Sequence, residues 1–173
     1  MIKKIAIVTA FIMFCACTNA LAFNWYAGTS LKLTSLSGDE SGTVFAVAPE
    51  VGYIFSDKID AGVGFAYATD DTGAEKTTEY LVVPFVRYKV YTKNNFSFFA
   101  RAQVSGGSID DGIERSDVFG AALMPVVEYA VSDRFTLFTS FAAVSYEKVS
   151  SKTESFSLDV DMNDLTVGFS VNF

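Results

Sequence analysis

The chain has 173 residues, of which 50% are hydrophobic, and it carries a formal net charge of −7 with no histidine. The length suits one domain, and the apolar fraction exceeds what a small soluble domain needs, so the excess must face something other than water. The missing histidine removes the usual general base of hydrolases, and no basic patch supports nucleic-acid binding.

The first 22 residues have the pattern of a secretory signal peptide. A lysine pair precedes an apolar run over residues 5–17, and Ala-Leu-Ala at 20–22 offers a small-residue cleavage site. The apolar run is too short to span a bilayer. The mature chain is therefore expected to begin at Phe23, with residues 1–22 removed on export.

Both cysteines lie inside this segment, at Cys15 and Cys17. A lipoprotein signal that lipidates Cys17 is an alternative interpretation, although the residues before it match that pattern poorly. Whether both cysteines are removed with the signal peptide or Cys17 is lipidated, the mature chain is expected to have no disulfide, no thiolate nucleophile and no cysteine metal site.

All three prolines open the same five-residue pattern, Pro-x-Val-x-Tyr, at residues 49–53, 84–88 and 125–129. Each copy runs into a short polar segment, and residues 165–173 repeat the frame with Leu for Pro and Phe for Tyr. The copies are spaced by 35, 41 and 40 residues. Such a period indicates one repeated supersecondary unit.

Period-2 alternation identifies this unit as a β-hairpin. In the second copy one face carries Tyr80, Val82, Pro84, Val86, Tyr88 and Val90. Partner strands are expected at residues 61–69, 96–105 and 135–146, each joined to the preceding copy by a short turn, and residues 25–33 precede the first copy. The pattern predicts eight strands in four hairpins.

The other connections are long and polar, at residues 36–43, 69–79, 106–117 and about 147–161. Short turns on one side and long loops on the other are typical of outer-membrane barrels, whose strands need about 9–11 residues to cross. By this analogy the short turns and both termini face the periplasm, and the long loops face the outside.

The face opposite the aromatic and branched side chains is polar or rich in glycine. Its members are Gly28, Ser30, Lys32, Glu50, Gly52, Gly62, Gly64, Arg87, Arg101, Gln103, Glu128, Ser170 and Asn172. A lipocalin-type barrel needs an apolar lumen, which this face cannot line, and a secreted β-sandwich is a second soluble alternative. With the polar face inside, residues 23–173 are predicted to form an all-β, eight-stranded, antiparallel, up-and-down transmembrane β-barrel.

An aromatic residue recurs near each short turn on the lipid-facing side. Tyr53, Tyr88, Tyr129 and Phe169 lie about four residues before a turn, the height of an interfacial aromatic girdle on the periplasmic side. The proline at the head of each copy costs one ladder hydrogen bond, and a bulge at that level would be one way to accommodate it.

These features resemble the small outer-membrane β-barrel superfamily, which includes the OmpA transmembrane domain, the OmpX/Ail group and opacity-type proteins. Residues 167–173, Val-Gly-Phe-Ser-Val-Asn-Phe, are similar to the terminal signal that the barrel-assembly machinery reads in this superfamily. The resemblance implies that Phe169, Val171 and Phe173 form this assembly signal. It also implies a Gram-negative outer membrane, with its lipids and lipopolysaccharide as surroundings.

Four charged residues are expected at one height of the lumen, about five to seven residues from the short turns. They are Glu50, Arg87, Arg101 and Glu128. Ionised groups in so narrow a space need partners, so a salt-bridge network is predicted, with Lys32 or Lys89 near its rim. This network either plugs the lumen and sets strand register or gates a narrow ion path.

Enzymatic activity is not expected. Barrel lipases, lipid A deacylases and omptin-type proteases resemble one another in relying on a histidine base, which this chain lacks. No cofactor is expected, and zinc is implausible without His or Cys. The acidic pairs Asp70-Asp71 and Asp110-Asp111 are weak candidates for Ca²⁺ or Mg²⁺ bridging, and solvated turn residues are the simpler interpretation.

Acidic charge gathers in the long connections. The mature chain has 11 basic and 20 acidic residues, a net charge of −9, and the four long segments alone carry −10. The predicted function is a non-enzymatic barrel with a plugged lumen, serving envelope integrity or adhesion through its acidic loops to a host or surface ligand. The loops could equally form only a hydrated rim, and a narrow channel for ions or small solutes, as OmpW-like relatives suggest, is the alternative function.

Overall fold

The computed structural model describes residues 24–36, 42–71, 77–112, 115–140, 144–149, 153–157 and 165–173, and the expected signal segment lies outside them. Its strands are β1 (Trp25–Leu36), β2 (Gly42–Ile54), β3 (Ile59–Asp70), β4 (Thr77–Lys93), β5 (Phe96–Asp110), β6 (Arg115–Ala130), β7 (Phe135–Ser140), β8 (Val144–Val149), β9 (Thr153–Ser157) and β10 (Thr166–Asn172). Among these described residues, no helix is long and apolar enough to cross a membrane.

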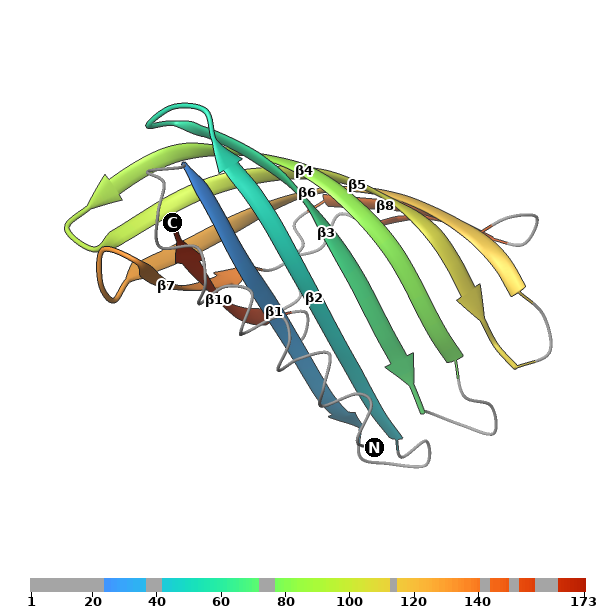
Figure 1. Cartoon of the computed structure of the whole chain (residues 1–173). Coiled ribbons are helices and arrows are strands. Elements are labelled where there is room, and N and C mark those ends of the chain that lie inside the picture. The colour runs from blue at the N-terminus through green and yellow to red at the C-terminus, as the bar shows by residue number, and fades with distance from the viewer. Residues whose placement is uncertain are drawn as a thin grey trace.

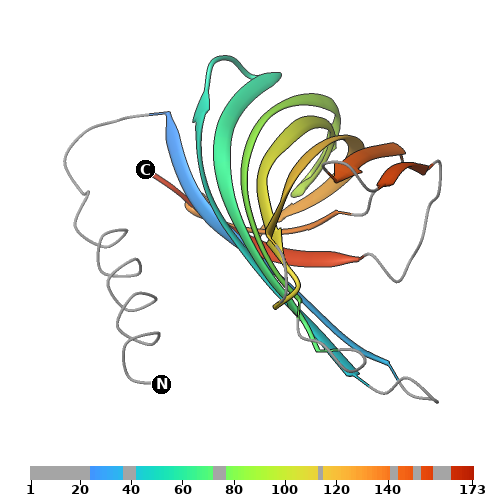
Figure 2. The ribbon, with the colours of Figure 1, turned by 90° about the vertical axis from the view of Figure 1, so that its right-hand side faces the viewer.

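The strands close into one antiparallel barrel of eight staves, a stave being one strand position in the wall. From β1 to β6 each strand pairs with the next along the chain. Both β7 and β8 pair with β6, at its two ends, so they share the seventh stave. The eighth is shared by β9, which pairs with β8, and β10, which pairs with β7 and closes on β1. Figure 2 shows this closure, with β10 in red beside β1 in blue, and the predicted fold class is confirmed.

Three short turns lie together at one end of the barrel, beside the C-terminus (Figure 1). We call this the short-turn end; its turns are residues 55–58, 94–95 and 131–134. The first and third turns share a geometry, because Ser56 Oγ accepts from the Ile59 amide and Ser132 Oγ accepts from the Phe135 amide, each at 3.1 Å. In the second, Asn94 has a φ of 54°, which asparagine tolerates in a tight hairpin.

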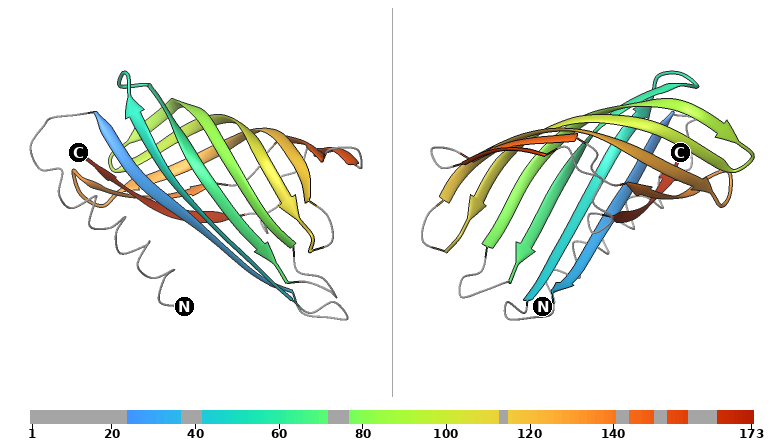
Figure 3. Two further views of the ribbon diagram at one scale, coloured as in Figure 1. Left: turned by 45° about the vertical axis from the view of Figure 1, so that its right-hand side comes forward. Right: turned by 180° about the vertical axis from the view of Figure 1, so that it is seen from behind.

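At the opposite end, the long-loop end, the hairpins continue further than the hydrophobic pattern indicated (Figure 3). The predicted loop at residues 106–117 is wrong over most of its length, since β5 runs to Asp110 and β6 begins at Arg115. Likewise β9 lies inside the predicted loop at 147–161. The ladder continues because its hydrogen bonds join backbone groups and need no apolar face. Apolar alternation therefore marks only the part of each strand that faces apolar surroundings.

The outer face of the barrel is an apolar band. Its exposed side chains include Leu31, Val51, Val63, Phe65, Val82, Val86, Val104, Phe119, Leu123, Leu137 and Val167. On β6 the band extends from Tyr129 to Phe119, ten residues apart, or about 33 Å along the strand and about 25 Å along the axis at a tilt of roughly 40°. This height matches the apolar band of a transmembrane barrel, about 25 Å.

Two of the three prolines of the repeated motif leave the strand register unchanged, and the register changes at the third. The register between β2 and β3 is the same on both sides of Pro49, and the register between β4 and β5 is the same on both sides of Pro84. At Pro125 the pairing of β6 changes by one residue, because Val126 is the partner of Ser140 whereas Leu123 is the partner of Val144. A further register shift lies between Lys89 and Tyr91 of β4. The expectation of a bulge at the proline level is therefore wrong at Pro49 and Pro84, where losing one N–H interrupts pairing with a single neighbour and leaves the other neighbour's ladder in place.

Candidate functional site

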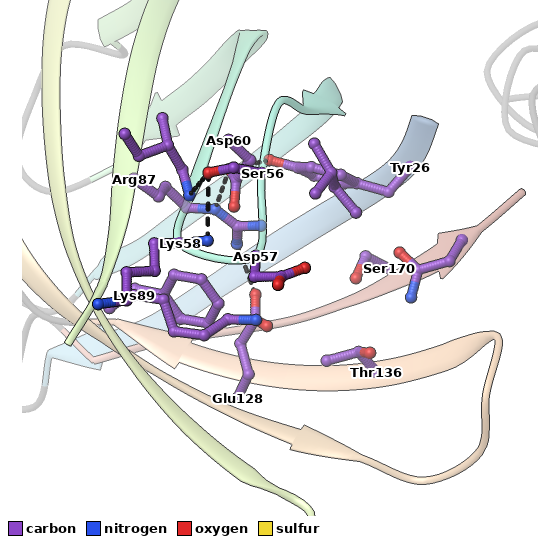
Figure 4. A pocket seen from close by; sticks show the side chains of 14 residues that line it. Tyr26, Ser56, Asp57, Lys58, Asp60, Arg87, Lys89, Glu128, Thr136 and Ser170 are labelled. Atoms are coloured by element: carbon purple, nitrogen blue, oxygen red, sulfur yellow. Dashed lines mark hydrogen bonds and ion pairs between the residues drawn. The ribbon is translucent and has the colours of Figure 1, made fainter. Parts of the chain in front are cut away.

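An arginine of β4 joins several staves near the short-turn end. Arg87 Nε donates to Asp60 Oδ1 of β3 at 2.6 Å, and Arg87 Nη1 donates to Glu128 Oε1 of β6 at 2.5 Å. The Tyr26 hydroxyl of β1 donates to the same Asp60 oxygen at 3.1 Å. The guanidinium also lies 4.8 Å from the ring centroid of Tyr26 and 4.9 Å from that of Phe99. We call Tyr26, Asp60, Arg87 and Glu128 the Arg87 cluster (Figure 4).

A second arginine reaches across the lumen. Arg101 Nη1, on β5, donates to Glu50 Oε2 on β2 at 2.7 Å, and Arg101 Nε donates to Gln103 Oε1 at 2.9 Å. Because β2 and β5 are three staves apart, this ion pair spans the interior. The Arg101 guanidinium lies 3.9 Å from the ring centroid of Phe85, a cation–π contact. We call Glu50, Phe85, Arg101 and Gln103 the Arg101 cluster.

The four charged residues expected at one height thus lie on the inner face in two clusters, and within the described chain no ion pair joins one cluster to the other. Arg87 and Arg101 are register partners on neighbouring strands. Two like charges so close would repel, so each requires a carboxylate of its own. That requirement separates the expected single network into two.

Of the two lysines expected at the rim, Lys89 lies near the Arg87 cluster, with Nζ 5.4 Å from the Phe99 ring centroid. Lys32 lies on β1 opposite Ala46, four residues beyond Gly28, the register partner of Glu50. The sequence analysis missed two members of the Arg87 cluster, Tyr26 and Asp60. Extending the period-2 pattern one step from Gly28 and from Gly62 would have placed both on the inner face.

The interior is not polar throughout, which corrects the expected polar lumen. Its buried apolar side chains are Val83, Phe85, Phe99, Val118, Val126 and Phe138. The rings fit because glycines face them. A Cβ added to Gly52 would overlap the Tyr26 ring, and one added to Gly168 would overlap the Phe138 ring. Each ring thus fills the space that a glycine leaves at the paired position of the neighbouring strand, as in a packed core.

Four of the five charged side chains of the two clusters are almost fully buried, and the Glu128 side chain is 14% exposed. The exposed fractions are 4% for Asp60, 6% for Arg87, 7% for Glu50 and 9% for Arg101. A water-sized sphere therefore reaches very little of these side chains from either end of the barrel. Among the fully buried side-chain oxygen and nitrogen atoms of the described residues, one has no hydrogen-bond partner: Oε1 of the Glu50 carboxylate.

A cavity of about 130 Å³ opens at the short-turn end, and we call it the mouth cavity (Figure 4). The Arg87 cluster forms part of its lining. The remaining lining residues are Ile54, Ser56, Asp57, Lys58, Ile59, Lys89, Phe99, Thr136, Ser170 and Asn172.

The aromatic residues expected to form a girdle lie on the outer face near the short-turn end. The side chains of Tyr88, Tyr129 and Phe169 are exposed, and Tyr53 is half-buried. Cross-strand ring contacts support the row: the ring centroids are 5.1 Å apart for Trp25 and Tyr53, 4.8 Å for Phe96 and Tyr129, and 5.9 Å for Phe135 and Phe169.

The terminal strand is held on both sides by its neighbours. The Phe173 amide donates to the Trp25 carbonyl at 2.9 Å, and the Asn172 amide donates to the Arg134 carbonyl at 2.8 Å. The side chain of Val171 is half-buried, as is that of Phe173. The last strand is therefore the one that closes the barrel on β1.

The acidic pairs at the long-loop end flank the start of β4. Asp70 is the register partner of Thr77, and Asp110 is that of Thr78, so the two acids lie on opposite sides of β4. The Asp110 carboxylate accepts from the Gly112 amide at 2.9 Å, a turn contact. Within the described ranges no three or more His, Cys, Asp or Glu side chains gather as a metal would require.

No protein-family model matches the chain, and no curated protein matches it. Among solved structures, the chain is similar to the crystal structure of Neisserial surface protein A (NspA), with 20% identity, a TM-score of 0.57, and coverage of 88% of this chain and 98% of that one. A de novo designed transmembrane β-barrel matches with 13% identity and a TM-score of 0.41, covering 89% of this chain and 98% of that one. The likeness to the Neisserial protein establishes a shared barrel fold.

Proposed function

We propose that this chain is a non-enzymatic β-barrel protein of a Gram-negative outer membrane, with a plugged lumen, that serves envelope integrity or surface interaction. The apolar outer band of about 25 Å supports membrane insertion, because in water such a surface would drive association. The fold shared with Neisserial surface protein A, whose name places it at a surface, supports the same setting.

The observation that carries the plugged lumen is the burial of the Arg87 and Arg101 clusters. Their ion pairs run from β4 to β3 and β6, and from β5 to β2, so they bridge walls that enclose the interior. Aromatic rings packed against glycines fill part of the remaining space. Breaking such a buried pair leaves an uncompensated charge, which costs about 3–5 kcal/mol, so spontaneous opening is disfavoured.

The surface role rests on charge. The long segments at the long-loop end carry most of the acidic excess of the chain, so they suit basic partners, or lipopolysaccharide bridged through divalent cations. For assembly, we propose that the barrel-assembly machinery reads the C-terminal strand, with Phe169, Val171 and Phe173 as the recognised residues. The short turns would then face the periplasm.

Conductance recordings test the plug. Purified protein in planar bilayers is expected to give no steady openings, and liposomes that contain it are expected to retain small ions. Glu128→Ala removes one of the two carboxylates bound to Arg87, and the same recordings on this variant test whether any conductance passes the ion pair. Steady openings of the unaltered protein whose size changes in Glu128→Ala would overturn the plugged lumen; Asp133→Ala, in an exposed turn, is the matched control.

A narrow ion path is the second candidate, and one atom favours it. Glu50 Oε1 is buried in the lumen without a hydrogen-bond partner among the described residues. A buried unpaired oxygen commonly holds a water molecule, and a water at this height would lie on any path along the axis. Openings that are lost in Glu50→Gln would favour this second function over the plug.

A further inference from the structure

The mouth cavity combines features that the plugged lumen does not require. It lies on the short-turn side of the Arg87 cluster, and its volume of about 130 Å³ has room for several water molecules or one small anion. Its walls come from both sides of the barrel, with Lys58 and Lys89 on one side and Thr136 and Ser170 on the other (Figure 4).

Two lysines of the cavity are not engaged in ion pairs with described residues, in a lining that has three acidic and three basic side chains. Of the carboxylates in its lining, Asp60 and Glu128 are both bound by Arg87. Within the described ranges no ion pair engages Lys89, whose ammonium lies over the Phe99 ring. Lys58, on the exposed turn, likewise has no ion pair in that part of the chain, and the remaining acid, Asp57, is an exposed residue of the same turn.

The facing wall supplies buried hydroxyl groups. Thr136 is 7% exposed and Ser170 is 6% exposed, yet both line the cavity. Neither side chain makes a hydrogen bond with any residue that the structure describes. Neither hydroxyl oxygen is a fully buried atom without a partner, so both open onto the cavity. Each hydroxyl can donate to an acceptor in the cavity, and the amide of Asn172 lies beside them in the lining.

We propose that the mouth cavity is a binding site for a small soluble oxyanion, a phosphate or carboxylate group that enters from the short-turn end. Lys89 and Lys58 provide charge-assisted hydrogen bonds to the oxyanion, and Thr136 and Ser170 donate to its remaining oxygens. Binding here depends only on the barrel's mouth, so it stands apart from whether the lumen conducts.

Amide NMR on the isotopically labelled, purified barrel in uncharged detergent micelles tests the site. Titration with inorganic phosphate, and separately with acetate, is expected to give saturable shifts confined to Lys89, Thr136, Ser170 and their neighbours. Lys89→Gln is expected to weaken binding by roughly tenfold to a hundredfold, the loss of one charge-assisted hydrogen bond. Thr136→Val, which keeps the shape and removes the donor, is expected to weaken it by several-fold.

Lys93→Gln is the matched control, because Lys93 is an exposed lysine of the same strand outside the cavity lining, and it is expected to leave the affinity unchanged. Shifts that do not saturate, or that Lys89→Gln and Lys93→Gln reduce equally, would overturn the proposal as surface charge screening. Repeating the titration in nanodiscs separates the sources. Amide shifts at the mouth cavity that appear in nanodiscs containing phosphatidylglycerol, and not on addition of inorganic phosphate, would overturn the soluble ligand in favour of a lipid headgroup.

Discussion

Replacing Gly62 by alanine tests whether the lumen is packed like a protein core. A Cβ at this position would lie 2.7 Å from Phe85 Cζ, and it would overlap the Val51 carbonyl oxygen. Carbon atoms prefer separations of about 3.5–4.0 Å, so the methyl group would be roughly 1 Å too close. Phe85 cannot yield freely, because the Arg101 guanidinium lies on its ring. Overpacking of this kind costs about 1–3 kcal/mol.

Gly64→Ala is the matched control, two residues away on the same strand and the same inner face. There the nearest atoms to an added Cβ lie at 3.5 Å and 3.6 Å, which is ordinary contact. Both substitutions gain the same roughly 0.5–1 kcal/mol that alanine has over glycine in a strand. The difference between the two variants therefore isolates the overpacking cost, about 1–3 kcal/mol.

Reversible urea unfolding of the barrel in lipid vesicles, followed by fluorescence of the single tryptophan, Trp25, measures this difference. Gly106→Ala, on β5 with no atom within 4 Å of the added Cβ, gives a second baseline. Equal unfolding midpoints for Gly62→Ala and Gly64→Ala would refute the reasoning, because they would mean that the space beside Phe85 is empty rather than filled.

Two further predictions concern the Arg87 cluster. Arg87→Met leaves Asp60 and Glu128 buried and unpaired, so it is expected to lower the free energy of unfolding by about 3–5 kcal/mol. Urea unfolding measures this loss. A triple variant that also carries Asp60→Asn and Glu128→Gln is expected to recover part of it. An Arg87→Met barrel of unchanged stability would contradict a structural role for the ion pairs. Tyr26→Phe keeps the ring against Gly52 and removes one hydrogen bond to a carboxylate, so a loss of about 1.5–3 kcal/mol is expected. In the same assay Tyr88→Phe, on the outer face, should be near neutral, and equal effects of the two substitutions would argue against the bond between Tyr26 and Asp60.

The faces of the strands could be predicted from the sequence because side-chain direction in a strand alternates with period 2. That rule placed Glu50, Arg87, Arg101 and Glu128 on one face. It also predicted the eight strands and the short turns, since each turn follows the repeated motif directly. It missed Tyr26, although the expected strand at residues 25–33 contains it, because the inner face was followed only as far as Gly28. It missed Asp60 because the expected strand at residues 61–69 began one residue too late.

Strand ends at the long-loop end could not be predicted in the same way. At Asp110 and Arg115 the hairpin of β5 and β6 has left the apolar band, yet backbone pairing holds it together. Hydrophobic alternation reports the surroundings of a strand, whereas the ladder depends on backbone groups that every residue except proline carries.

Alternation along the chain by itself determined which side chains face inward and that inward charges must be paired, because a narrow interior cannot hold an isolated ion. Only the closed barrel decided the partners: Arg87 with Asp60 and Glu128, and Arg101 with Glu50 across the lumen. Those choices depend on the stagger between staves and on where glycines leave room for rings. Both are properties of strands brought together around a common axis, and no single strand carries them.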